Sequence, residues 1–557
     1  MTVRSRARLA ALAVPLFLLV IAAALRLPDL ATRGTWDADQ GHDMLVLRGL
    51  VRDGVVPLLG PPTSIGDVHH GAVYYYLLAP AAALTGGDSP LAVTALIALA
   101  GIAAVLVTWW LARSMGGPLA GFVAGFAMAV SASAVDESTF IWNPNLIALS
   151  SAIALAGAWR AWTTRRPRWW LLAGLGTAIT MQCHVLGVTM LPIIAALLVA
   201  DARSRPPGPE RRSVWRFGLA GLAIVAVSFL PLAIHEWTTD FSEINAALDY
   251  LRSGGDPVAL GPIARLLVIG TRVTSWPLTG LLTDGAIAAM AATLTVIAIT
   301  VWLARAGTRR EREAARWLGL GLLWTAFALT FVSPSLATVV PGLPNDHYHA
   351  FADPMVFCLV GLGVGALWRG GAGASATGEA RAEASASSEA GVTATGGAGA
   401  TGATGATRGA TRTRAGRAIA VVGVIALLGW NLANQSPGVH PDGGFPAAEA
   451  AADRILETAD GRGLTLRSLP DFKSSEAYAY PLVRAGATVR MEEGGGPATP
   501  TGDLLVVICD ALFETAIGAP CGGVAEAEIA PADRFGQPVD RFLAAPGRTI
   551  SVYRPAP

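Results

Sequence analysis

Long apolar runs recur along the chain and dominate its pattern. A bilayer core about 30 Å thick requires about 20 apolar residues of helix, and a helix satisfies its own backbone polar groups there. Eleven runs of about this length are present, near 9–27, 89–112, 117–135, 143–162, 168–182, 184–200, 215–235, 285–304, 316–333, 350–368 and 417–434. The pattern predicts a polytopic α-helical membrane protein with about eleven spans.

The segments between these runs divide the chain into parts. We predict a membrane module over 1–368 with two large outer loops, at 28–88 and 236–284. Residues 369–415 are mostly Gly, Ala, Thr and Ser, a composition that cannot bury a core and predicts a disordered cytoplasmic linker. A final span at 416–435 then leads to a soluble part, 436–557.

This C-terminal part has the pattern of a small α/β domain. A helical pattern covers 447–459, and strand-like runs follow at 464–468, 488–491 and 504–509. Cys509 and Cys521 both belong to this part, and an oxidising compartment favours a disulfide between them. The other two cysteines lie in spans, where a thiol behaves as a small apolar residue.

Charge assigns a side of the membrane to each loop. The chain has 557 residues, of which 53% are hydrophobic and 15% are charged. Soluble proteins have about 25% charged residues, so an ordinary soluble enzyme is excluded, and a net charge of +1 gives no reason to expect nucleic-acid binding. With the N-terminus inside, the N-terminal segment and the four short inner loops carry 18 arginines, and the outer loops before the last span carry 6. This excess predicts a cytoplasmic-membrane protein with a cytoplasmic N-terminus and an extracytoplasmic C-terminal domain.

The first run has the start of a secretory signal. It follows Arg4, Arg6 and Arg8 but has no small-residue cleavage site before Arg26. We therefore expect an uncleaved anchor.

Histidine and carboxylate side chains gather on the predicted outer side. All eight histidines fall in outer loops or at outer span ends: His42, His69, His70, His184, His235, His347, His349 and His440. Imidazoles and carboxylates at one face suit general-base or metal chemistry. Any single one of them is better explained as a polar residue of the interface, but the set as a whole predicts an outward-facing active site.

Three outer segments contain recognisable motifs. The first loop has an acidic stretch, an Arg-Gly stretch and a His-Tyr stretch: Trp36-Asp37-Ala38-Asp39-Gln40-Gly41-His42-Asp43, Arg48-Gly49-Leu50 with Gly54, and His69-His70-Gly71-Ala72-Val73-Tyr74-Tyr75-Tyr76. The second has Asp136-Glu137 followed by Ile141-Trp142-Asn143-Pro144-Asn145-Leu146. The third has Asn345-Asp346-His347-Tyr348-His349 followed by Pro354.

In order, spacing and sidedness these motifs resemble those of the GT-C glycosyltransferases. The similarity is to the bacterial relatives of protein O-mannosyltransferases and aminoarabinose transferases, over roughly residues 10–365. Two motifs depart from the family pattern. The usual Asp-Glu pair is Asp39-Gln40 here, with Asp37 two residues earlier, and the usual His-Pro-Pro is His70-Gly71-Ala72.

The resemblance implies transfer of a sugar from a polyprenyl-phosphate carrier to a hydroxyl of a glycan, lipid or protein at the outer face, with inversion. An ionised carboxylate accepts the hydroxyl proton. Asp39 is our first candidate for this catalytic base and Asp37 the second. Either residue is also well placed to cap the helix that begins near His42.

Substrate binding is assigned to nearby polar and aromatic residues. The candidates are His69, His70, Tyr75, Arg48, Arg272, Asp136, Glu137, Trp142, Asn143 and His347. Here arginines and imidazoles would contact the phosphate, and aromatic rings would stack on sugar or polyprenyl. The aromatic residues also fit an interfacial belt. No cofactor is certain; a divalent cation held by Asp39, His69 or His235 is a weaker expectation.

Two other functions stay open. A transporter or lipid flippase would favour inverted repeats and intramembrane charges, and neither is evident in the sequence. A polymerase or ligase of lipid-diphosphate-linked glycans would need basic residues near a pyrophosphate.

Overall fold

Each of the eleven predicted runs is helical in the computed structural model. The model describes residues 3–63, 68–252, 260–280, 285–338, 347–369, 401–471, 474–492, 494, 496–511 and 521–556. The helices of the runs are α1 (Val3–Arg26), α4 (Pro90–Gly116), α5 (Pro118–Val130), α7 (Ile147–Thr164), α8 (Trp169–Cys183), α9 (Met190–Arg203), α10 (Pro209–Ser228), α14 (Ala286–Ala306), α15 (Arg309–Val332), α16 (Asp353–Arg369) and α18 (Thr401–Ala433).

Helix length limits how many of these runs cross a membrane unaided. Among the described residues, seven helices are long and apolar enough, and α10 with α11 (Leu230–Thr238), which meet at 43°, makes an eighth. The other three runs, at α1, α5 and α8, form shorter helices or helices described only in part. The predicted fold class, a polytopic helical membrane protein with a small C-terminal α/β domain, is confirmed.

The predicted outer loops contain several helices and a hairpin. The first folds into α2 (Ala38–Arg48), the π-turn η1 (Gly49–Asp53), α3 (Val73–Ala83) and a hairpin of β1 (Leu59–Pro62) with β2 (His69–Gly71). The second large loop contributes α11, α12 (Ser242–Arg252) and α13 (Pro262–Thr279). Short elements join the spans: α6 (Ala132–Asp136), η2 (Asn143–Leu146), η3 (Val185–Thr189), η4 (Pro334–Ala337) and η5 (Ala350–Ala352).

The C-terminal domain is a five-stranded sheet in the order β4-β3-β5-β7-β6. The predicted helix and strands correspond to α19 (Gly444–Ala459), β3 (Leu464–Leu469), β4 (Val489–Met491) and β5 (Leu504–Asp510), and these three strands are parallel. The pattern missed α20 (Ser475–Arg484), α21 (Val524–Ile529), α22 (Ala532–Phe535) and the antiparallel strands β6 (Asp540–Ala545) and β7 (Arg548–Tyr553). The favoured disulfide between Cys509 and Cys521 is present.

The predicted linker lies largely outside the described residues. Its last part differs from the prediction, because α18 is helical from Thr401 and so begins before the expected span at 416. Residues 370–400 of the linker are not among those described.

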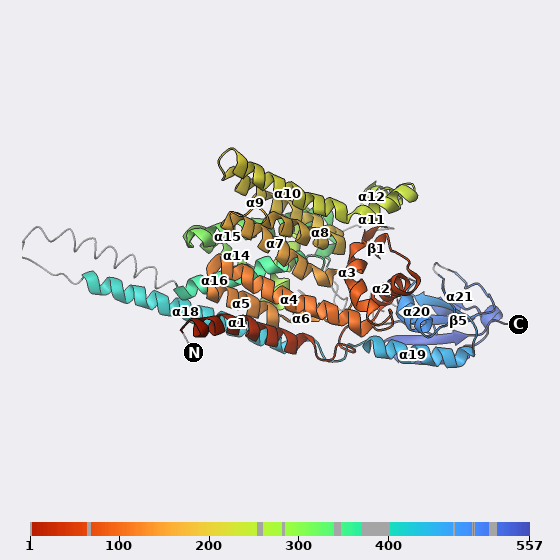
Figure 1. The fold of residues 1–557 in the computed structure, drawn as a ribbon. Helices are drawn as coiled ribbons and strands as arrows, with labels where there is room; N and C mark the ends of the chain where they lie inside the picture. The colour runs from red at the N-terminus through yellow and green to blue at the C-terminus, as the bar shows by residue number, and fades with distance from the viewer. Residues whose placement is uncertain are drawn as a thin grey trace, which may run out of the picture.

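The bundle has two ends of different character (Figure 1). We name the end against the C-terminal domain the domain end; it carries α2, α3, α6 and residues 182–189, 333–338 and 347–353. The opposite end, which we name the arginine end, carries the loops near 113–118, 160–168, 201–212 and 305–316. Arg369 contacts both Gly116 and Glu311 there, so loops far apart in sequence meet. The predicted inner and outer loops thus segregate to opposite ends.

Close packing of backbone holds these parts together. A Cβ on Gly361 would collide with the Ala120 carbonyl of α5, which explains the glycine-rich second half of α16 as tight helix packing. A Cβ on Gly41 would collide with the Glu476 backbone of α20. Helix α2 is therefore pressed directly against the C-terminal domain, and the candidate catalytic residues lie at this junction.

Candidate functional site

Asp37 caps α2 and ties it to the C-terminal domain. Its carboxylate accepts the Ala38 N–H, and a capping box forms with Gln40. The same carboxylate lies 3.0 Å from Arg548 and accepts the Ser474 hydroxyl at 3.0 Å. The capping alternative therefore holds for Asp37, whose carboxylate contacts Ala38, Ser474 and Arg548.

Asp39 lies in the first turn of α2, and its side chain is exposed. One turn further along, Asp43 is buried and accepts the hydroxyls of Tyr74 at 2.7 Å and Tyr75 at 2.9 Å. Burial raises the pKa of Asp43 to about 7, although His42 and the two tyrosines oppose the rise. Helix α2 thus has an exposed carboxylate, Asp39, and one turn further along a buried carboxyl group, Asp43, with a pKa near neutral pH.

His42 lies on the same helix and contacts the C-terminal domain. Its Nδ1 is 2.8 Å from the Glu476 carboxylate of α20. Burial alone would lower the pKa of His42, but the hydrogen bond and charge of Glu476, with the nearby Asp43 and Asp39, raise it to about 9. At neutral pH this is an ion pair between the module and the domain.

Arg48 is held by an ion pair within the first loop. Both Arg48 and Arg52 contact the carboxylate of Asp88, just before α4. This pairing closes the loop that contains α2 and α3, and gives Arg48 a structural partner.

His69 and His235 each contact a different partner on α12. The Glu243 carboxylate of α12 accepts the His69 backbone N–H at 2.7 Å and lies 2.9 Å from its Nδ1. His235 of α11 contacts the Ser242 hydroxyl at 3.3 Å. Among the described residues, the groups of three or more ligand atoms within 4.8 Å of one another do not include Asp39, His69 and His235. The structure does not bring these three together as one metal site.

A row of rings runs from the first loop to the third. His70 lies 4.4 Å from His184, and His184 stacks on Tyr348 at 4.4 Å. Tyr348 in turn lies 5.8 Å from Trp142, measured between ring centroids. Burial and the neighbouring His69 lower the pKa of His70 to about 3, so this imidazole is neutral. The motifs of all three outer segments meet in this row.

The predicted residue Asn143 binds the chain next to this row of rings. Its side-chain amide donates to the Cys183 carbonyl at 2.5 Å, which fixes the chain just before His184. Asn143 is buried, and this hydrogen bond satisfies its donor. The contact of Asn143 is therefore with the backbone that positions His184.

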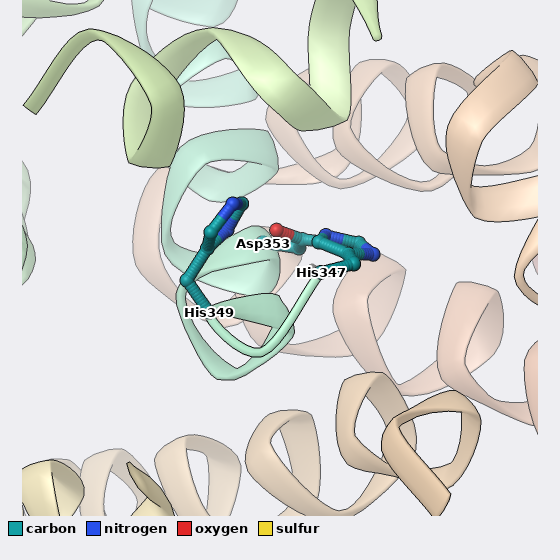
Figure 2. A group of neighbouring side chains, drawn as sticks. All are labelled: His347, His349 and Asp353. Atoms are coloured by element: carbon teal, nitrogen blue, oxygen red, sulfur yellow. The ribbon is translucent and has the colours of Figure 1, made fainter. Parts of the chain in front are cut away.

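A second cluster surrounds His347, His349 and Asp353 (Figure 2). The three side chains are buried, and each offers a ligand atom within 4.8 Å of the others. Trp276 of α13 stacks on His347 at 4.9 Å and meets His349 edge-on at 5.3 Å. Arg272, one turn earlier on α13, lies over the Trp276 ring and donates to the Leu336 carbonyl at 2.6 Å.

Asp136 and Glu137 are neighbours in sequence but point to different partners. Glu137 lies 3.4 Å from Nδ1 of His347, whereas Asp136 interacts with Ser436, His440 and Arg33 near the end of α18. Burial raises the pKa of both carboxyl groups. Glu137 therefore belongs to the His347 cluster, and Asp136 belongs to the junction with the C-terminal domain.

An apolar groove leads to this end of the bundle between α9 and α15. It is lined by Val188, Thr189, Pro192, Trp324, Phe327, Ala328, Phe331 and Val332. One wall starts in η3, directly after His184, and the other ends at α15, directly before the turn η4 that Arg272 binds. Both walls of the groove thus run into the polar clusters.

Several residues of these clusters were absent from the predicted site. Asp43, His184, Tyr348, His349, Asp353 and Glu243 all contact a predicted residue. Asp43 and His349 lay within the motifs already quoted, so the signal for them was present. Asp353 begins an apolar run and was included in a span.

Comparisons with known proteins bear on the fold and the family of this chain. Residues 69–234 match the model of a family described as dolichyl-phosphate-mannose-protein mannosyltransferase. No curated protein matches the chain in sequence. Among solved structures, ArnT from Cupriavidus metallidurans in the apo state is similar with a TM-score of 0.57 at 13% identity, over 98% of each chain. The same protein bound to undecaprenyl phosphate gives a TM-score of 0.53 at 11% identity, over 97% of each chain.

At such identities the likeness to ArnT shows the fold, and the family match covers one stretch that starts at the His-Tyr motif. Together the two findings confirm the resemblance drawn from the motifs: this chain has the fold of the GT-C glycosyltransferases and resembles them in sequence over residues 69–234.

Proposed function

We propose that this protein transfers a sugar from a polyprenyl-phosphate carrier to an acceptor hydroxyl at the outer face of the cytoplasmic membrane. The observation that carries the proposal is the apolar groove between α9 and α15, whose two walls end at the buried polar clusters. A lipid tail suits the groove, and the headgroup then lies among imidazoles, carboxylates and Arg272. The solved ArnT bound to undecaprenyl phosphate has the same fold and supports this choice of carrier.

The domain end is assigned to the outer face because of the arginine distribution. The loops at the arginine end carry the excess of positive charge that faces the cytoplasm in membrane proteins. The N-terminus is then cytoplasmic, and the C-terminal domain covers the outer opening.

The reaction we propose is a single inverting displacement. The acceptor hydroxyl oxygen attacks the anomeric carbon, and a new bond forms there as the bond from that carbon to the phosphate oxygen breaks. The phosphate leaves with the bonding electron pair, and the hydroxyl proton passes to a carboxylate. Asp39 is the proposed base because its side chain is exposed in the first turn of α2, one turn before the buried Asp43.

The departing phosphate needs positive charge near the end of the groove. Arg272 is buried at this point, beside Trp276 and bound to the turn that follows the groove wall. Arg48 is further from this role because it pairs with Asp88. We therefore propose Arg272 as the phosphate partner.

The test is transfer in proteoliposomes from a radiolabelled polyprenyl-phosphate sugar to total envelope acceptors. Asp39→Asn is compared with Glu313→Gln, which removes a carboxylate that pairs with Arg309 at the arginine end. Transfer by the wild type and by Glu313→Gln, with loss in Asp39→Asn, is the expected result. Donor movement across the bilayer without transfer would favour the flippase alternative and overturn the proposal.

A further inference from the structure

The cluster of His347, His349 and Asp353 combines a compact donor set with unusual burial. His347 and His349 flank a single residue, and Asp353 opens α16 four residues after His349. All three are almost fully buried, with exposed fractions of 2%, 0% and 2%. Their ligand atoms lie within 4.8 Å of one another, and Figure 2 shows the Asp353 carboxylate directed between the two rings.

Several buried polar atoms of this cluster have no hydrogen-bond partner among the described residues. They are both ring nitrogens of His349, both ring nitrogens of His347, Oδ1 of Asp353 and Oε2 of Glu137. Although His347 lies 3.1 Å from Asp353 and 3.4 Å from Glu137, neither contact has hydrogen-bond geometry. A buried polar group without a partner costs about 1–3 kcal/mol, so such a concentration of them points to a bound species.

We propose that His347, His349 and Asp353 bind a divalent transition-metal cation of the zinc type. Two imidazoles and one carboxylate are a donor set that zinc takes in three-ligand sites, which keep a fourth position for water or substrate. Tetrahedral zinc places its donors about 3.4 Å apart. The 3.1 Å between Nε2 of His347 and Asp353 is close to this, and a ligand atom of His349 lies within 4.8 Å of both.

Glu137 completes the arrangement as the residue that orients a ligand. Its carboxylate faces Nδ1 of His347, the nitrogen opposite the one that faces Asp353. A metal-bound histidine usually directs its other ring nitrogen to such a carboxylate. The charges also balance, since a divalent cation neutralises Asp353 and Glu137 in a buried place. Arg272 nearby is directed to the Leu336 carbonyl and over Trp276.

The proposal concerns binding alone and does not rest on the transferase function. A metal here would fix the start of α16 to the second outer segment, between the ring row and α13. The competing occupant is a proton: the two carboxylates can hold His347 as a cation, and water can then fill the rest. The experiment must therefore measure metal.

The measurement is metal content of the full chain purified in nanodiscs, by elemental mass spectrometry, followed by removal of metal and titration with Zn²⁺ or Co²⁺. We expect about one ion per wild-type chain. His349→Ala should lose stoichiometric binding, and Glu137→Gln should keep the ion but bind it about 10–100-fold more weakly. His235→Ala is the matched control, a domain-end histidine outside the cluster, and should bind like the wild type.

A second variant keeps the proposal testable if His349→Ala does not fold. His349→Cys loaded with Co²⁺ should show a sulfur-to-cobalt charge-transfer band that wild type lacks, because the new thiolate would be a ligand. A folded wild type that retains no Zn²⁺ or Co²⁺ would overturn the proposal in favour of the protonated pair. Equal metal content in wild type and folded His349→Ala, with loss in His235→Ala, would place the metal elsewhere.

Discussion

The two ends of the helical bundle differ in how their buried carboxylates are paired. At the arginine end, Asp201 is fully buried and receives Arg205 at 3.0 Å, Arg165 at 3.3 Å and the Trp170 indole at 3.2 Å. Glu311 is also buried there, where it completes the cap of α15 and pairs with Arg369. These carboxylates have direct partners, as structural ion pairs require.

At the domain end, some buried ionisable groups have a shifted pKa or lack hydrogen-bond partners, and a purely structural role requires neither. Asp43 has a pKa raised to about 7, and His349 has two ring nitrogens without hydrogen-bond partners among the described residues. Such perturbed groups concentrate at functional sites. The difference teaches that a buried carboxylate alone does not mark a site in this protein, whereas buried carboxyl and imidazole groups with unpaired atoms do.

The largest expected effect is a loss of transfer activity on removing a carboxylate at the domain end but not at the arginine end. Asp39→Asn should lower the rate of sugar transfer by about 10²–10⁴-fold, the usual contribution of a general base. Glu313→Gln at the arginine end should keep the wild-type rate per folded molecule. Transfer from the labelled donor measures both, and an active Asp39→Asn would remove Asp39 from the mechanism.

The next effect separates the ends by stability. Asp201→Ala leaves Arg165 and Arg205 beside each other without their carboxylate, which costs about 3–5 kcal/mol for a buried pair that loses one partner. We expect a large drop in the temperature of unfolding, with transfer retained below that temperature. A folded variant of unchanged stability would show that the arginine-end pairs are not structural.

A moderate effect tests the groove that leads to the domain end. Ala328→Trp fills the groove between α9 and α15 and should raise the KM for a long-chain donor about tenfold, the equivalent of about two methylenes of lost contact. Leu320→Trp is the control, because Leu320 is exposed on the same helix outside the groove. Equal KM values for the two variants would contradict the assignment of the groove to the lipid tail.

The smallest effect concerns the junction of α2 with the C-terminal domain. The folded pKa of His42 is raised to about 9 from an ordinary value of 6.5, so its contribution to stability is complete below pH 6.5 and is lost as the pH rises to 9. We expect the unfolding temperature to fall by about 1–2 °C between pH 7.5 and 9.5. Glu476→Gln should flatten this slope; an unchanged slope would assign it to other groups.

The apolar runs predicted the helices because a membrane requires continuous apolar segments. The same reasoning missed α13, whose apolar residues alternate with Arg265 and Arg272 within a predicted loop. It also missed β6 and β7, which begin with the charged residues Asp540 and Arg548.

The site was predicted less completely than the fold. The order of motifs predicted Asp39, His70, Trp142 and His347, of which the structure places His70 and Trp142 in the row of rings and His347 in the buried cluster. The sequence did not reveal roles that depend on burial: Asp43 is buried and its carboxylate accepts the hydroxyls of two tyrosines. Asp353 opens an apolar helix, and only packing against α13 and Glu137 makes it part of a cluster.

The most direct test of the contrast between the ends is the place where the carrier's headgroup binds. A polyprenyl-phosphate analogue with a photoreactive group beside the phosphate is crosslinked to the protein in nanodiscs, and the labelled peptides are identified by mass spectrometry. We predict labels at the domain end, in residues 182–189 and 347–353 and on α13 near Arg272. Labels concentrated in residues 160–168, 201–212 or 305–316 would place the headgroup at the arginine end and contradict the account.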